Sequence, residues 1–192
     1  MPVVLRGGDG KQVRVLVDGT AQVQLPGCKV PVVVNAGQKG YFRTAYAPMQ
    51  FKALAAGFSA LPVVDQLGVL NDTNALAGAG VQPETDLLNL AAQVKVGASP
   101  DIWDMVASIY DSVDGSFERD QVARAAWRAY AVPHLSEEFA TLGWDNRDDD
   151  SAQIQQLRTR LIGSLSGMGD AAVIAEARRR FAGFQALSLI HI

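Results

Sequence analysis

The hydrophobic period of this 192-residue chain changes once, near Pro48, and this change constrains the fold more than any other feature. Before Pro48, apolar residues recur at every second position, as in strands with one buried face. After Pro48 they recur every three to four positions, as in amphipathic helices. The pattern predicts an α+β chain in which strands come first and helices follow.

Alternating residues predict the strands. Val13, Val15 and Val17 share one face, and residues 21–25 alternate in the same way. Residues 30–34 form a continuous apolar run, which is typical of a more deeply buried strand. The stretch 32–48 (VVVNAGQKGYFRTAYAP) reads as a strand, a turn and a second strand. We expect about five strands in all, enough for part of a β-sandwich.

Glycine-containing dipeptides predict the turns between these strands. Asp9-Gly10 and Asp18-Gly19 are hairpin signals, because glycine accepts the positive φ of tight turns. Pro26-Gly27 predicts a further turn.

The helical part contains one strongly amphipathic segment that begins at Ser99. Ser99 can cap the helix, and Pro100 suits its first position. One apolar stripe follows, formed by Ile102, Trp103, Val106, Ile109, Tyr110 and Val113. The spacing predicts a helix that buries this stripe.

Two more helices are predicted towards the C-terminus. The first carries the apolar residues Ile154, Leu157, Leu161, Ile162 and Leu165, and the acidic run 148–150 precedes it. Asp170 is a natural N-cap for the second, whose apolar residues are Val173, Ile174, Ala177 and Phe181. Pro133 should divide residues 117–142 into two helices or kink a single one. We expect antiparallel helix pairs, stacked as a HEAT-like array of helical hairpins.

Charge and composition exclude several classes of function. The net charge is −3 and the basic residues are scattered, so the sequence indicates no basic surface that would bind nucleic acid. No apolar run approaches the roughly 20 residues that span a bilayer. The single cysteine, Cys28, excludes an intrachain disulfide and leaves the compartment open.

The chain carries no recognisable catalytic or metal site. Its two histidines, His134 and His191, are far apart and neither belongs to a His-Glu-x-x-His motif, so no zinc site is predicted. A Gly-x-Ser-x-Gly nucleophile turn is also absent, and the glycine-rich stretches lack phosphate-loop spacing. We therefore expect no catalytic residue, no metal ligand and no cofactor in this chain.

The order of the motifs nevertheless resembles a known family. The stretch "LPGCKVPVVVNAGQKGYFRTAY" is followed by "FSALPVVDQLGVLNDTNALAGAG", "SPDIWDMVASIYDSV", "FATLGWD", "LRTRLIGSLSGMGD" and "EARRRF". In this order they resemble the C-terminal portion of the puromycin-sensitive-aminopeptidase-like zinc aminopeptidases (gluzincins), and the bacterial branch fits best. The most specific motif is Asn-x-Gly-Gln-x-Gly-Tyr-x-Arg.

The resemblance implies a fragment of a four-part enzyme that removes N-terminal residues from peptides. Its HEAT-like helices would form the wall or cap of the peptide cavity. The zinc site would lie in a catalytic domain upstream, so the implied partners are that domain and the peptide substrate. This fragment's own activity stays uncertain.

The family signature falls on eight positions of this chain. They are Asn35, Gly37, Gly40, Tyr41, Arg43, Tyr46, Asp65 and Asp72. We expect structural roles for them, with the glycines permitting a tight turn and Arg43 pairing with a carboxylate at the junction of strands and helices. Which residues contact peptide is not indicated.

The resemblance also suggests domain boundaries. Residues 1–47 would be the end of a β-sandwich and residues 48–186 the start of the helical domain. The last six residues, 187–192 (LSLIHI), look like a translated sequencing adapter, so truncation at both ends is expected. A second interpretation is a stand-alone helical-repeat adaptor that binds proteins on a concave surface.

Overall fold

A computed structural model describes residues 1–25 and 31–188 of the chain. The chain forms two compact units, Met1–Ile102 and Trp103–Ile192, and the boundary falls in the first turn of helix α4 (Pro100–Ser116). The predicted boundary between residues 47 and 48 lies inside the first unit, so the sheet and the first helices belong to one compact body. The domain division at 47 therefore stays a prediction.

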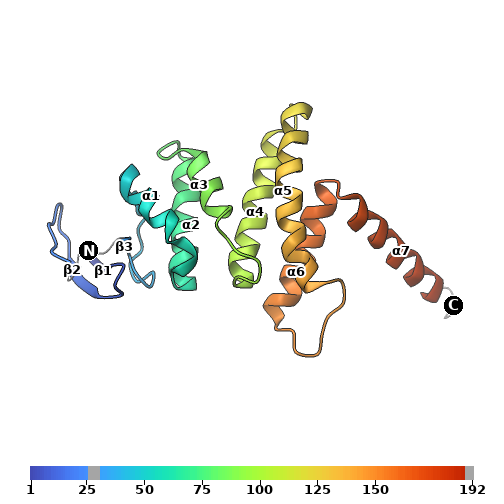
Figure 1. Cartoon of the computed structure of the whole chain (residues 1–192), viewed down its shortest axis with the longest axis horizontal. Coiled ribbons are helices and arrows are strands. Elements are labelled where there is room, and N and C mark those ends of the chain that lie inside the picture. The colour runs from blue at the N-terminus through green and yellow to red at the C-terminus, as the bar shows by residue number, and fades with distance from the viewer. Residues whose placement is uncertain (26–30, 189–192) are drawn as a thin grey trace. The chain divides into compact units, whose positions relative to one another are not determined.

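The first unit begins with a small antiparallel sheet (Figure 1). Its strands are β1 (Pro2–Arg6), β2 (Gln12–Leu16) and β3 (Val33–Val34), in the order β2-β1-β3. The turn predicted at Asp9-Gly10 is confirmed, with Gly10 at φ 83° and its N–H bonded to the carbonyl of Gly7. An α+β chain with strands first and helices after is therefore confirmed.

Two of the predicted strands are wrong. Residues 21–25 form no strand, although Val23 and Leu25 are half-buried and the intervening glutamines are exposed. The alternation predicted which side chains turn inward, but it holds no information about whether a neighbouring backbone is there to pair with. Consequently Asp18-Gly19 is a bend with no second strand after it.

The stretch 32–48 is also not a strand, a turn and a second strand. Its first strand is only β3, because Asn35 takes the left-handed φ of 61° and no strand can continue through that conformation. Residues 41–46 have no ladder partner. The structure thus shows three strands among the described residues, and a sandwich is not shown. Cys28 and the turn predicted at Pro26-Gly27 lie outside the described residues.

Three α-helices complete the first unit. They are α1 (Pro48–Ala56), α2 (Val63–Gly78) and α3 (Glu84–Ala91), with a 3-10 turn at Phe58–Ala60 between the first two. Pro48 occupies the first position of α1, where its missing N–H costs no hydrogen bond. Helix α2 packs against α3. The core of the helical part includes Leu54, Phe58, Leu70 and Leu90, each fully buried.

The regular elements of the second unit are all helices over its described residues, up to Ser188. After α4 come α5 (Gln121–Leu142), α6 (Ala152–Gly167) and α7 (Ala171–Ser188), as Figure 1 shows. Contacts between Trp103 and His134 at one end, and between Tyr110 and Trp127 further along, show that α4 and α5 are antiparallel. Pro133 lies inside the single helix α5, so the two-helix alternative for residues 117–142 is wrong.

The predicted helix details fit this unit well. The apolar stripe of α4 is buried at Trp103, Val106 and Tyr110. Asp170 is confirmed as an N-cap, since its Oδ1 accepts the N–H of Val173 at 2.9 Å. His134 is not isolated on the surface, because its Nδ1 lies 2.7 Å from the hydroxyl of Tyr110.

The acidic run 148–150 directly precedes α6 as expected, whereas the end of α7 differs from the prediction. Ser151 caps α6, while Asp150 pairs with the buried Arg158 at 2.5 Å. In α7, Phe181 was expected on the buried stripe but is 61 % exposed, because no further helix of the described chain lies beyond α7 to cover it. Helix α7 ends at Ser188, two residues into the segment expected to derive from an adapter.

A buried carboxylate joins α4 to α5, and one of its arginine partners extends the link to α6. Asp114 at the end of α4 accepts hydrogen bonds from Arg124 (2.6 Å) and from Arg128 (2.6 Å), both on α5. Arg128 also donates to the carbonyl of Gly167 on α6 at 3.2 Å. The bonds from Arg128, and then those from Arg124, lower the pKa of Asp114 to about 2.

This lowered pKa predicts acid sensitivity of the second unit. The stabilisation that Asp114 provides is present above about pH 4, where the unfolded carboxyl is ionised, and is lost as the pH falls towards 2. When the pH falls from 5 to 2, the free energy of unfolding of the native chain should decrease by about 2 kcal/mol more than that of the Asp114→Asn variant. Urea unfolding followed by tryptophan fluorescence measures this, since Trp103, Trp127 and Trp144 all lie in the second unit.

The matched control is Glu118→Gln, which removes an exposed carboxylate near the same turn. It should retain the pH dependence of the native chain. An Asp114→Asn chain with that same dependence would contradict the role assigned to Asp114.

Candidate functional site

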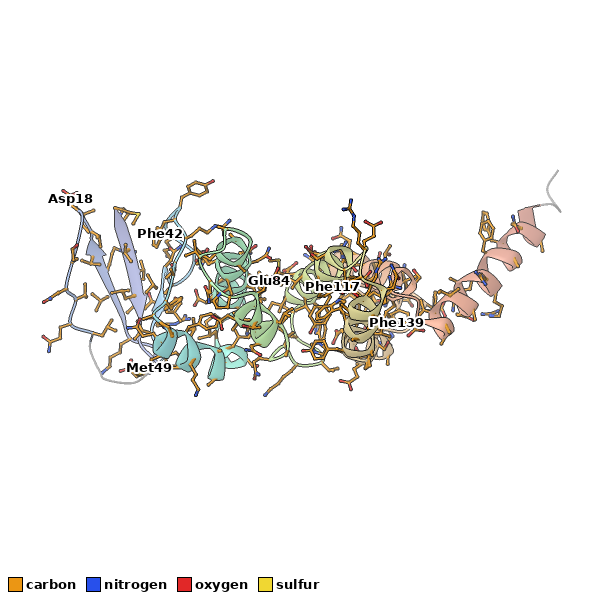
Figure 2. All side chains as sticks on the ribbon, turned by 90° about the horizontal axis from the view of Figure 1, so that it is seen from above. Asp18, Phe42, Met49, Glu84, Phe117 and Phe139 are labelled. Atoms are coloured by element: carbon orange, nitrogen blue, oxygen red, sulfur yellow. The ribbon has the colours of Figure 1, made fainter. Side chains whose placement is uncertain are left out.

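The signature residues gather where residues 35–46, here called the signature loop, lie on helix α2. The loop follows β3 directly and leads into α1. Asp65, Gly68 and Asp72 are spaced three and four residues apart on α2, and this spacing places them on one face of the helix. Figure 2 shows the loop, marked by Phe42, beside the first helices of the unit.

Asp65 anchors the beginning of the loop. It is completely buried, and its Oδ1 accepts the N–H of Gly37 at 2.6 Å. Its Oδ2 pairs with the guanidinium of Arg6 at the end of β1. One carboxylate thus joins the first strand, the loop and α2. A buried charge of this kind is stable only when it is both paired and hydrogen-bonded, as Asp65 is.

Asp72 anchors the end of the loop in the same way, two turns further along α2. Its Oδ1 accepts from Nη1 of Arg43 at 3.1 Å, and its Oδ2 accepts the N–H of Thr44 at 3.0 Å. Asp72 is 5 % exposed. Asp65 and Asp72, here called the carboxylate pair, therefore each bind one guanidinium and one backbone N–H.

The loop between these anchors is closed on itself. The Asn35 side chain donates to the carbonyl of Gly40 at 2.9 Å and accepts its N–H at 2.7 Å. A side chain at position 40 would overlap the ring of Phe42, so any larger residue there would displace that ring. Gly37 has a φ of 75°, a conformation that glycine accepts and that the expected tight turn requires.

A second glycine allows the loop to lie close to the helix. Gln38 crosses α2 over Gly68, and a side chain at position 68 would overlap the amide of Gln38. Gln38 itself has φ 52°, in the left-handed region.

Tyr46 closes the far end of the loop onto the sheet. Its hydroxyl accepts the N–H of Val34 at 2.9 Å, which satisfies a backbone donor that the sheet leaves unpaired. Burial raises the pKa of Tyr46 to about 12. A cavity of about 120 Å³ lies beside it, lined by Pro31, Val32, Val34, Tyr46, Gln50 and Ala53. Apart from Tyr46, whose hydroxyl is bonded to Val34 and whose pKa is raised, these residues offer no nucleophile or general base.

The geometry gives these groups no means of catalysis. All four oxygens of the carboxylate pair accept hydrogen bonds, so neither Asp65 nor Asp72 is open to a substrate or an ion. Across residues 1–25 and 31–188, no three His, Cys, Asp or Glu side chains come together in a way that could hold a metal ion. The residues described here therefore do not fit a zinc site.

Sequence reasoning missed two partners at this site. Arg6 was not singled out, although an arginine two residues after Val4 on a strand shares its inward face, and an inward arginine implies a buried carboxylate. Thr44 contributes only its backbone N–H, for which the sequence carries no signal. The remaining signature residue, Tyr41, makes no contact with the others and is fully exposed.

Removing one anchor should destabilise the first unit. Asp65→Ala leaves the partly buried Arg6 without its partner and the N–H of Gly37 without its acceptor, at a cost of about 3 kcal/mol. Hydrogen exchange of peptides from α2, read by mass spectrometry, measures this loss. Asn74→Ala is the matched control, because Asn74 is exposed on the same helix. That control should change the opening free energy by less than about 0.5 kcal/mol.

Two tyrosines of one loop offer a second comparison. Tyr46→Phe removes the acceptor of the Val34 N–H and should cost about 1 to 2 kcal/mol in the same exchange measurement. Tyr41→Phe removes an exposed hydroxyl and should cost nothing measurable. Equal effects of the two substitutions would show that the bond between Val34 and Tyr46 does not stabilise the loop.

Comparison with known proteins finds a matching family model and several similar proteins. Residues 31–191 match the family model of the ERAP1-like C-terminal domain. The chain is 29% identical over 174 residues to Aminopeptidase 2 of Candida albicans, covering 88% of this chain and 19% of that protein. It is also 29% identical over 156 residues to Aminopeptidase M1-A of Oryza sativa subsp. japonica, covering 78% of this chain and 17% of the relative.

Alanine/arginine aminopeptidase of Saccharomyces cerevisiae is 26% identical over 139 residues, which cover 71% of this chain and 16% of that protein. The chain thus spans less than a fifth of the length of these relatives, which come from fungi and plants. The expected bacterial branch stays a prediction. The family match extends from before the signature loop to the end of α7, and the chain belongs to the ERAP1-like C-terminal domain family.

Proposed function

We propose that this chain is a non-catalytic C-terminal portion of a zinc-dependent aminopeptidase that removes N-terminal residues from peptides. The observation that carries the proposal is the similarity to named aminopeptidases over as much as 88% of the chain. The chain spans 19% of that relative, so a catalytic part can lie elsewhere in the same polypeptide.

The described residues carry no group suited to the metal chemistry of such an enzyme. In such an enzyme zinc supplies a Lewis acid and an activated water. No group among the described residues fits that metal. The described residues provide two structural features. One is the joint, that is, the attachment of the signature loop to α2 through the carboxylate pair, and the other is a set of antiparallel helices. We assign the joint a structural role rather than contact with substrate, because its polar groups bond to one another.

The helices suit the role of a wall or cap for the peptide cavity. Within the units, α2 packs against α3, α5 against α6, and α6 against α7. Helices packed in this way can present an extended surface without any catalytic group. The peptide substrate would then meet this portion, while the chemistry takes place in the catalytic domain. A stand-alone adaptor is the less supported alternative, because the relatives named above are aminopeptidases. Over the described residues, no helix has the length and apolarity needed to cross a membrane.

The test compares two proteins. The first is the 192-residue chain, and the second is the polypeptide extended through the genomic reading frame upstream of Met1. We expect the chain alone to hydrolyse no aminoacyl p-nitroanilide and to bind no stoichiometric zinc by mass spectrometry. The extended protein should bind about one zinc and lose its hydrolysis to a chelator.

Two outcomes would overturn this proposal. One is an upstream frame that encodes no zinc motif and yields an inactive protein. The other is tight binding of one zinc by the 192-residue chain itself, which would place the metal among its own residues.

A further inference from the structure

The tip of the signature loop presents three side chains outward. Lys39, Tyr41 and Arg43 are exposed, whereas Gly40 and Phe42 between them are partly covered. Tyr41 is the most exposed of the large apolar residues described, and the side chain of Arg43 is 57% exposed despite its bond to Asp72. Lys39, Tyr41 and Arg43 are here called the loop tip, in which an exposed aromatic residue stands between two exposed basic residues of the sequence.

Hydrogen bonds fix the backbone on both sides of Tyr41, although the ring of Tyr41 itself is fully exposed. The bonds between Asn35 and Gly40 fix one side of Tyr41, and the bonds of Arg43 and Thr44 to Asp72 fix the other. Described residues other than glycine take a positive φ only at Asn35 and Gln38, both in this loop. Backbone strain that a structure maintains often marks a functional surface.

A rigid exposed aromatic beside an arginine has the properties of a binding hot spot. Tyrosine and arginine are over-represented among the residues that dominate protein interfaces. Because the loop is already fixed, little conformational entropy is lost when a partner covers it.

Charge indicates the chemistry of that partner. Residues 1–47 contain six Lys or Arg and two Asp or Glu, whereas the rest of the chain contains eleven and eighteen. Arg43 of the loop tip is already paired with Asp72, whereas Lys39 takes part in none of the ion pairs among the described residues, so the uncompensated positive charge of the tip is that of Lys39. Its electrostatic complement is an acidic surface.

We propose that the loop tip docks onto an acidic face of the preceding part of the same aminopeptidase polypeptide. This inference rests on the proposed function. The chain spans 19% of the length of Aminopeptidase 2, so most of the protein surface available to cover the tip would be covalently linked to it. Covalent linkage raises the effective concentration, so a small patch is sufficient.

Hydroxyl-radical footprinting of the native sequence tests the docking. Oxidation of Tyr41 is measured by mass spectrometry in the 192-residue chain and in the polypeptide extended upstream. We expect Tyr41 to react about tenfold more slowly in the extended protein, as a buried interface residue does. Val81, which is exposed between α2 and α3, is the internal reference and should keep its rate.

Charge reversal tests the electrostatic part. Lys39→Glu should restore most of the Tyr41 reactivity in the extended protein, whereas Lys11→Glu, on the exposed turn between β1 and β2, should not. Equal restoration by both variants, or by neither, would contradict an acidic partner at the loop tip.

The two proposals fail in different ways. An extended protein that is an active aminopeptidase, but in which Tyr41 reacts as fast as in the isolated chain, overturns the docking and leaves the function standing. An extended protein without zinc and activity overturns the function. Protection of Tyr41 in the isolated chain that increases with protein concentration would assign the loop tip to a second copy and also overturn the docking.

Discussion

The first unit depends on two carboxylates of one helix. Asp65 and Asp72 lie on a single face of α2, and each binds one guanidinium together with one backbone N–H of the signature loop. A small sheet is stable only when it has a hydrophobic face or a helix to pack against. Through Arg6 and Gly37 it is attached to the helices, and the helical core of Leu54, Phe58 and Leu70 then stabilises both parts.

The sequence predicted helices better than strands, for a physical reason. A helix closes its hydrogen bonds within itself, so the stripe from Trp103 to Tyr110 was enough to place α4. A strand needs a neighbouring strand to bond with, and the hydrophobic period does not indicate which segment that is. Val23 and Leu25 turn inward as expected, yet no backbone pairs with them. Asn35 ends β3 because its backbone is left-handed, and a polar residue after four valines and a proline gave only a weak indication of that.

The candidate site could be predicted in part. The turn at Gly37 was expected because glycine tolerates its conformation, and Arg43 was expected to pair with a carboxylate, which the structure identifies as Asp72. The contribution of Arg6 could have been inferred from its inward position on a strand. By contrast, the bond from the Thr44 N–H and the passage of Gln38 over Gly68 depend on how two distant segments meet, and no local pattern encodes them.

The anchors of the signature loop also order events during synthesis. Arg6 and Asp65 are 59 residues apart in sequence, while Gly37 and Arg43 lie 28 and 29 residues before their carboxylates. Contacts this distant form late, since the intervening chain must first be closed into a loop. While the ribosome has released only the strand segment, Arg6 has no carboxylate to bind. The sheet and the signature loop therefore cannot gain these anchors before α2 has emerged.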